Sequence, residues 1–158
     1  MTNKEFFVEI LQEEAPKFRK VIDALDEDKH GHKVHDRSRE AGNLAAQLGI
    51  QWKGISGIIT TGAPQFDPHE MENRTKAEML AEFDEGIAQL QKDLEGISDE
   101  DWENGEAGWG NGQFEKKYHM AWMFLLDAIH HRAQLATYLR AMGAKVPAIY
   151  GPSADSQS

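Results

Sequence analysis

The chain has 158 residues, 40% of them hydrophobic and 28% charged, and it contains no cysteine. The lack of cysteine excludes disulfides, thiolate metal ligands and thiol nucleophiles. A net charge of −10, from 17 Lys and Arg against 27 Asp and Glu, argues against nucleic acid and anionic membranes as partners, because both would be repelled by such a surface.

The length predicts a single domain over residues 1–158. The first residues, MTNKEFFVEILQEE, lack the basic region and the apolar run of a signal peptide. No apolar run approaches the ~20 residues of a membrane span. We therefore expect a cytoplasmic protein that does not enter a membrane.

The first predicted helix spans residues 3–25. Thr2 and Glu5 have the spacing of a capping box, in which each residue satisfies a free backbone N–H of the other. Apolar residues recur at near-helical intervals behind them. Pro16 lies inside this run and lacks a backbone donor, so it is expected to kink or divide the helix.

A histidine tract, KHGHKVH, precedes the second predicted helix and holds His30, His32 and His35. Histidine-rich tracts bind transition metals, but they are also frequent in solvated loops, and both interpretations stay open. His69 and His119 have no partner in the sequence and are interpreted as surface or structural residues.

The second helix is predicted to follow Ser38 as its N-cap, with Glu40 in the first turn favouring the helix dipole. Apolar residues between 41 and 59 are spaced alternately four and three apart, as on a helix face within a bundle. The residues TGAP at 61–64 then end the helix.

A second capping box, Thr75 with Glu78, predicts the start of the third helix, which ends near Gly96. Its apolar residues repeat the same three–four spacing.

Residues 98–113, SDEDWENGEAGWGNGQ, are acidic and rich in glycine and are predicted to form a long loop. Trp102 and Trp109 are expected to pin this loop to the helices, since large apolar groups seek burial.

The fourth helix is predicted over residues 114–142, with Gly143 as its stop. The tail AKVPAIYGPSADSQS is expected to lie extended over the surface. Four long amphipathic helices without a convincing strand predict an all-α four-helix bundle.

Asp127 and His131 lie four residues apart on the last helix and so share one face. A carboxylate and an imidazole at this spacing can ligate one metal ion, as facing helices do in many bundles. The alternative is an exposed pair with a weak salt bridge. Met120, Met123 and Tyr138 follow nearly the same line along the helix, which fits a pocket wall, core or a dimer contact.

The stretch DAIHHRAQLATYLRAMGAKVPAIYGPSAD resembles the C-terminal signature of the DinB-like (DinB/YfiT-like) superfamily of metal-dependent bundles. The segment RSREAGNLAAQLGIQW resembles the second helix of that family. The resemblance implies a four-helix bundle that forms a homodimer and holds a divalent metal in a pocket at one end.

The family supplies three histidine ligands, at the positions held here by Gln47, Asp127 and His131. Only His131 is retained. Gln47 offers a weaker amide oxygen and Asp127 offers a carboxylate, which suits harder ions. Either the site survives with a preference for manganese, magnesium or calcium over zinc or nickel, or the metal is lost and the three side chains hydrogen-bond one another.

The resemblance implies small-molecule chemistry around Gln47, Asp127 and His131, as in a metal- or thiol-dependent transferase or a hydrolase-like enzyme. A bound metal would lower the pKa of a thiol or a water. Without metal, His131 oriented by Asp127 would act as a general base. The competing hypothesis is a non-catalytic ligand-binding or stress-response protein that has kept the fold and lost the metal.

Overall fold

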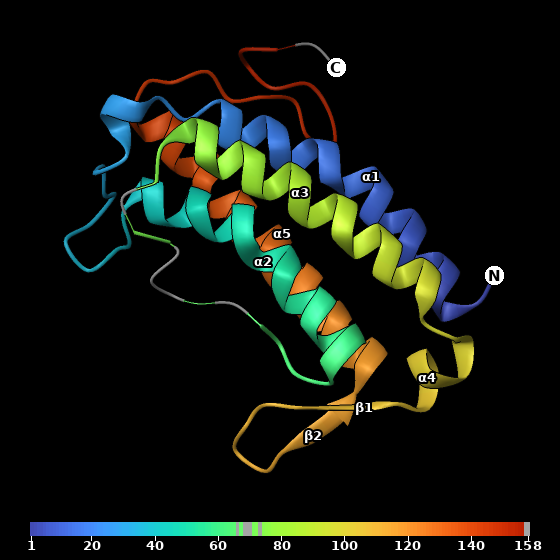
Figure 1. Ribbon diagram of the computed structural model, residues 1–158. Coiled ribbons are helices and arrows are strands. Elements are labelled where there is room, and N and C mark those ends of the chain that lie inside the picture. The colour runs from blue at the N-terminus through green and yellow to red at the C-terminus, as the bar shows by residue number, and fades with distance from the viewer. Residues whose placement is uncertain (66, 68–70, 73, 157–158) are drawn as a thin grey trace.

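The computed structural model describes residues 1–65, 67, 71–72 and 74–156. Four long helices run alongside one another as a bundle, which confirms the predicted fold class (Figure 1). They are α1 (Asn3–Asp23), α2 (Ala41–Thr61), α3 (Lys76–Gly96) and α5 (Lys117–Ala141). The shorter elements among the described residues are a 3₁₀ turn, η1 (Glu27–Lys29), a short helix, α4 (Asp99–Asn104), and the strands β1 (Glu106–Gly108) and β2 (Phe114–Lys116).

Two of the predicted helix starts are confirmed. At α1, the backbone N–H of Glu5 donates to Thr2 Oγ1 at 3.1 Å, and the N–H of Thr2 donates to Glu5 Oε2 at 2.7 Å. At α3, Thr75 and Glu78 form the same reciprocal box. Local side chains thus satisfy backbone groups that the first helical turn leaves free.

The predicted start of α2 at Ser38 is wrong. The N-cap is Glu40, and its side chain makes no capping hydrogen bond. The N–H of Ala41 instead donates to the carbonyl of His32 at 2.9 Å, and the N–H of Gly42 donates to the carbonyl of His30 at 2.8 Å. The preceding loop therefore caps the helix with backbone carbonyls, which leave no signature in the sequence.

Pro16 does not divide the first helix, because α1 continues through it as one element of 21 residues. Leu11 and Phe18, on either side of the proline, are both buried against the other helices. This packing on both sides offsets the missing backbone donor.

The predicted loop at 98–113 contains regular structure. Ser98 Oγ accepts from the N–H of Asp101 at 3.1 Å and caps α4. The strands β1 and β2 then pair in antiparallel fashion, so residues 114–116 belong to a hairpin rather than to the last helix. Trp102 is fully buried, whereas Trp109 on the hairpin keeps 39% of its surface exposed.

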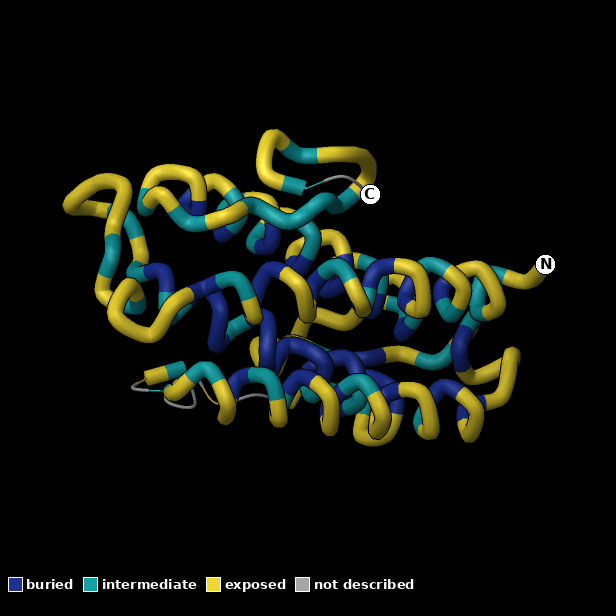
Figure 2. The backbone as a smooth tube through the Cα atoms, turned by 90° about the horizontal axis from the view of Figure 1, so that it is seen from above, coloured by how far each residue is buried: buried dark blue, intermediate teal, exposed yellow. Residues whose placement is uncertain are grey.

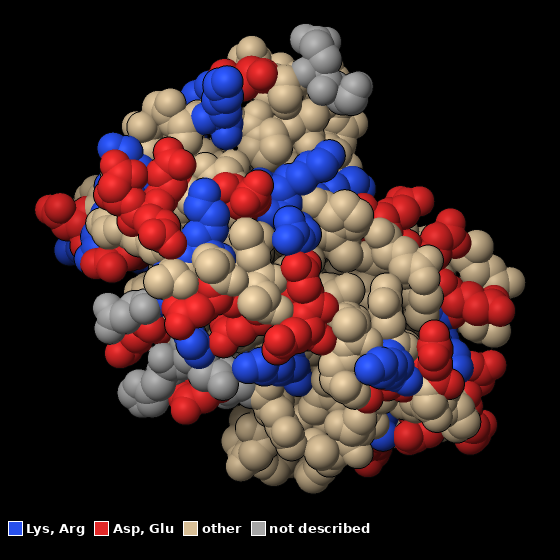
Figure 3. All heavy atoms as spheres, turned by 45° about the horizontal axis from the view of Figure 1, so that its top comes forward, with Lys and Arg blue, Asp and Glu red and all other residues tan. Residues whose placement is uncertain are grey.

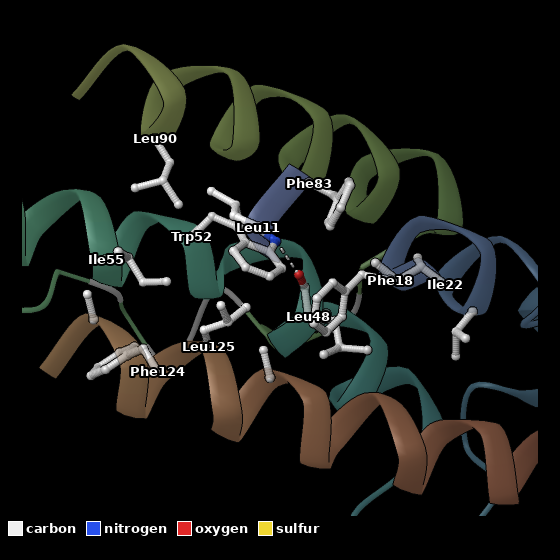
Figure 4. Packing of buried hydrophobic residues seen from close by; sticks show 14 of the residues in the cluster. Leu11, Phe18, Ile22, Leu48, Trp52, Ile55, Phe83, Leu90, Phe124 and Leu125 are labelled. Carbon is white, nitrogen blue, oxygen red and sulfur yellow. Dashed lines mark hydrogen bonds between the residues drawn. The ribbon is translucent and has the colours of Figure 1, made fainter. Parts of the chain in front are cut away.

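The buried faces of the long helices point toward one another (Figure 2). Trp52 of α2 lies at the centre of the core, with the ring centroids of Phe18 at 4.9 Å and Phe83 at 5.6 Å, both edge-on (Figure 4). Its indole N–H donates to the carbonyl of Leu48 at 2.8 Å. This residue ties α2 to both α1 and α3.

A buried charge cluster joins α1, α5 and the C-terminal segment. Arg132 donates to Glu14 Oε2 at 2.5 Å and to the hydroxyl of Tyr150 at 2.6 Å, and Tyr150 donates to Glu14 Oε2 at 2.8 Å. Lys17 donates to the other oxygen of Glu14 at 2.6 Å. Tyr150 thereby fixes the extended tail, which crosses over the bundle in Figure 1.

This cluster predicts how stability depends on pH. Burial alone raises the pKa of Glu14, but hydrogen bonds from Lys17, Arg132 and Tyr150 outweigh it and hold the pKa below its ordinary value of 4.5. A depressed pKa contributes stability above pH 4.5 that is lost as the pH falls through the folded-state value. Urea unfolding from pH 7 down to pH 3 should therefore show a smaller loss of unfolding free energy for Glu14→Gln than for the wild type.

The matched control for this prediction is Glu13→Gln, which changes the exposed neighbouring carboxyl on the same helix. Its pH profile should follow that of the wild type. A Glu14→Gln profile with the same slope as the wild type would contradict the role given to this carboxylate.

On the face shown in Figure 3, Lys and Arg side chains stand among Asp and Glu and do not merge into a continuous basic surface. Among the helices of the described residues, none combines the length and the apolar character required to cross a membrane.

Candidate functional site

A cavity of about 300 Å³ lies between α2 and α5, beside the hairpin. Each of these helices contributes both polar and apolar side chains to the wall of the cavity. Its lining consists of Gln47, Ile50 and Gln51 from α2, Met123, Phe124 and Asp127 from α5, and Trp109 from the hairpin.

The polar end of the cavity centres on one oxygen of Asp127. Three nitrogens lie around Oδ2: Nε2 of Gln51 at 3.1 Å, Nε2 of His131 at 3.4 Å and Nε2 of Gln47 at 3.5 Å. Gln47, Asp127 and His131 therefore converge, as the resemblance implies. The carboxylate is surrounded mainly by neutral donors.

Gln51 belongs to this site, although the sequence did not single it out. Its amide nitrogen donates to the carbonyl of Phe124 at 2.7 Å as well as to Asp127. Reversing the amide would turn its oxygen toward two acceptors, so its orientation is fixed. The side chain is only 5% exposed, and Oε1 has no hydrogen-bond partner among the described residues. A buried acceptor without a donor costs free energy.

The opposite wall is aromatic. The rings of Trp109 and Phe124 stack, with centroids 5.9 Å apart and planes 21° apart. Gly54 makes room for this wall, since a Cβ there would lie 2.7 Å from Cε1 of Phe124. The N–H of Gly108 donates to the carbonyl of Gly62 at 2.8 Å and fixes the hairpin to the end of α2.

A cation also lies next to this site. Arg39 donates from Nη1 to Oε1 of Gln47 and from Nη2 to the carbonyl of Asn43 at 3.3 Å. Burial lowers the pKa of Arg39, while the charge of Asp127 and then that of Tyr138 raise it. A guanidinium remains protonated at neutral pH, so the site carries a permanent positive charge.

The side chains as arranged do not fit a tightly held divalent ion. The only atom of Gln47 that can ligate a metal already accepts from Arg39, and its nitrogen end faces Asp127. The misfit lies at Gln47, because His131, with Nδ1 against Gln134 Oε1 at 2.8 Å and Nε2 toward Asp127, keeps an orientation in which a histidine can ligate. Within the described ranges, no three His, Asp or Glu side chains form a group that could hold a metal. Metal binding at these residues stays a prediction that this geometry disfavours.

The three residues predicted to follow one line along the last helix, Met120, Met123 and Tyr138, have different surroundings in the structure. Met123 lines the cavity, whereas Met120 is fully buried in the core. Tyr138 is only 7% exposed, and its hydroxyl donates to the carbonyl of Arg39 at 3.1 Å. Met123 is therefore the one of the three that lines this cavity, whereas Tyr138 lines a separate cavity together with Arg39.

Among the described residues, the contacts given by the histidine tract are structural ones. The carbonyls of His30 and His32 cap α2, and the ring of His32 meets that of Tyr138 edge-on at 6.3 Å. Nδ1 of His35 accepts from a backbone N–H two residues on, at 3.1 Å. His69 lies outside the described residues.

Comparison with known proteins agrees with this architecture. The model of the DinB family matches residues 1–157. A DinB-like protein from Bacillus cereus superposes with a TM-score of 0.78 at 14% identity, covering 92% of this chain and 97% of that one. A DinB-like protein from Bacillus subtilis gives 0.72 at 16% identity, covering 90% and 96%.

A variant of the mycothiol-dependent maleylpyruvate isomerase is also similar, with a TM-score of 0.59 at 14% identity, covering 93% of this chain and 67% of that one. No curated protein matches the sequence. At these identities the structural likeness establishes the fold alone.

Proposed function

The chain belongs to the DinB family, and we propose that its cavity between α2 and α5 binds a small, largely apolar organic molecule that carries a hydrogen-bond donor. The observation that carries this proposal is the buried Oε1 of Gln51, which has no donor among the described residues. A ligand N–H or O–H that displaces the side chains covering this oxygen would satisfy it and remove the cost of leaving it unpaired.

The size and lining of the cavity support a molecule of one or two rings. About 300 Å³ lies at the lower end of the range for small-molecule sites. Ile50, Met123 and Phe124 supply apolar surface, and Trp109 offers an aromatic face. Sites of this kind gain affinity from the apolar walls and orientation from a few polar groups.

The position of His131 favours ligand binding over proton transfer as the role of this site. Asp127 lines the cavity, but His131 stands behind it and is not among the lining residues. A general base must reach the proton that it removes.

The metal- or thiol-dependent transferase and the hydrolase-like activity stay predictions, as do the cytoplasmic location and the homodimer. Met123 and Leu126, exposed on α5, offer apolar surface for a second copy.

Matched pairs of small probes test the proposal. Indole and phenol present a donor that N-methylindole and anisole lack, at nearly the same size. In saturation-transfer NMR titrations, the donor-bearing member of each pair should bind about tenfold more tightly, since an unpaired buried acceptor costs roughly 1–3 kcal/mol. In Gln51→Leu the two members should bind alike. A wild-type protein that binds neither pair, or does not distinguish their members, would overturn the proposal.

Blocking the cavity gives a second test. Met123→Trp places a larger side chain into the lining and should abolish probe binding. Leu126→Trp, three residues on, makes a comparable change at a position that is 58% exposed and not among the lining residues. Probe affinity in that control should equal that of the wild type, and equal losses in both variants would place the binding elsewhere.

A further inference from the structure

We infer that the guanidinium of Arg39 replaces the divalent ion at this site, so that a permanent cation of the chain neutralises Asp127 through Gln47. The first step is the order in which Arg39, Gln47 and Asp127 contact one another. Arg39 donates to the amide oxygen of Gln47, and the amide nitrogen of Gln47 faces Oδ2 of Asp127 at 3.5 Å. A primary amide has one accepting end and one donating end, so it can bridge a cation and an anion.

The second step is the way in which Arg39 is held. Its backbone carbonyl accepts from the hydroxyl of Tyr138 at 3.1 Å, which ties the loop before α2 to α5. Its Nη2 meets the carbonyl of Asn43 at 3.3 Å and Sδ of Met71 at 3.5 Å. Contacts at its backbone carbonyl and at its guanidinium therefore hold Arg39 in the position that bridges to Gln47.

The third step is the electrostatic consequence for a metal. A divalent ion ligated by Asp127 and His131 would be drawn to the carboxylate but repelled by the nearby guanidinium. It would also have to take Oε1 of Gln47 away from Arg39. Providing a better third ligand is therefore insufficient while the cation remains, and removing the cation is the step that opens the site to metal.

The test compares Gln47→His with Arg39→Met/Gln47→His, both of which keep Asp127 and His131. Two imidazoles and one carboxylate form a donor set suited to zinc or nickel. In isothermal titration with nickel alone, the double variant should bind one ion per chain at least about tenfold more tightly than the single variant, because the nearby like charge is gone. Cobalt absorption spectra should report ligation in the double variant only.

Three controls distinguish the effect of the Arg39 charge on nickel affinity from other effects of the substitutions. Arg37→Met/Gln47→His removes an arginine of the same loop that, like Arg39, is exposed, and it should bind nickel as weakly as Gln47→His. Arg39→Lys/Gln47→His keeps a cation and should also stay weak. Circular dichroism melting establishes that each variant is folded, and Arg39→Gln replaces Arg39→Met if the latter is not.

Equal nickel affinity with and without Arg39, in folded proteins, would overturn the inference, as would tight binding by the wild type. Because the readout is a metal alone, these outcomes are independent of whether indole or phenol binds the cavity.

Discussion

Replacing Arg132 by leucine is expected to lower the free energy of unfolding by about 3 kcal/mol, because it breaks a buried ion pair by removing one partner. Arg132 is 2% exposed and Glu14 is 5% exposed, so neither charge is hydrated by bulk water. Without the arginine, the partners left to the carboxylate among the described residues are Lys17 and Tyr150. Urea unfolding at pH 7 measures the loss.

The double variant Glu14→Leu/Arg132→Leu provides the control, because it removes both charges and leaves apolar side chains of similar volume. Such replacements of buried pairs are often close to neutral. We expect it to recover most of the stability lost in the single variant. A double variant that is less stable than Arg132→Leu would show that the pair contributes through something other than charge compensation.

Trp52→Ala is expected to cost about 3–5 kcal/mol, which is the range for a fully buried large aromatic side chain. The indole fills the space where α1, α2 and α3 meet and has edge-on contacts with Phe18 and Phe83. Gly86 of α3 approaches so closely that a Cβ there would lie 3.2 Å from Cβ of Trp52, so the surrounding helices are already in contact. Thermal unfolding followed by circular dichroism measures the effect.

Trp109→Ala is the matched control, because it makes the same change at a side chain that is 39% exposed. Its unfolding free energy should fall by less than about 1 kcal/mol, since surface substitutions have small effects, although probe binding in the cavity should weaken. Comparable losses for the two tryptophans would mean that the hairpin is a structural part of the core.

The parts of the fold that local sequence determines were predicted. The capping boxes at Thr2 and Thr75 place the interacting groups three residues apart, so their pattern is visible without tertiary structure. The hairpin was missed because its strands are three residues long and too short to show alternation. The start of α2 was misplaced because backbone carbonyls of His30 and His32 serve as its cap.

Of the residues around the cavity, those that the sequence singled out came from the family resemblance, and their role stays a prediction. Gln47, Asp127 and His131 were brought together as expected. Gln51 and Arg39 were missed, because the importance of each depends on tertiary contacts. The unpaired oxygen of Gln51 follows from its bonds to α5. Gln51 lies one helical turn after Gln47 on the same face, and this spacing was the signal available in the sequence.

The buried cluster around Glu14 bears on the order in which the helices of the bundle assemble. The partners of Glu14 lie far along the chain, Arg132 118 residues and Tyr150 136 residues after it. Until α5 is in place, Lys17 is the one strong partner of the carboxylate among the described residues, and burying it would be costly. We therefore expect α1 to complete its packing onto the bundle only together with α5, so the pairing of the first and last long helices is a late step of folding.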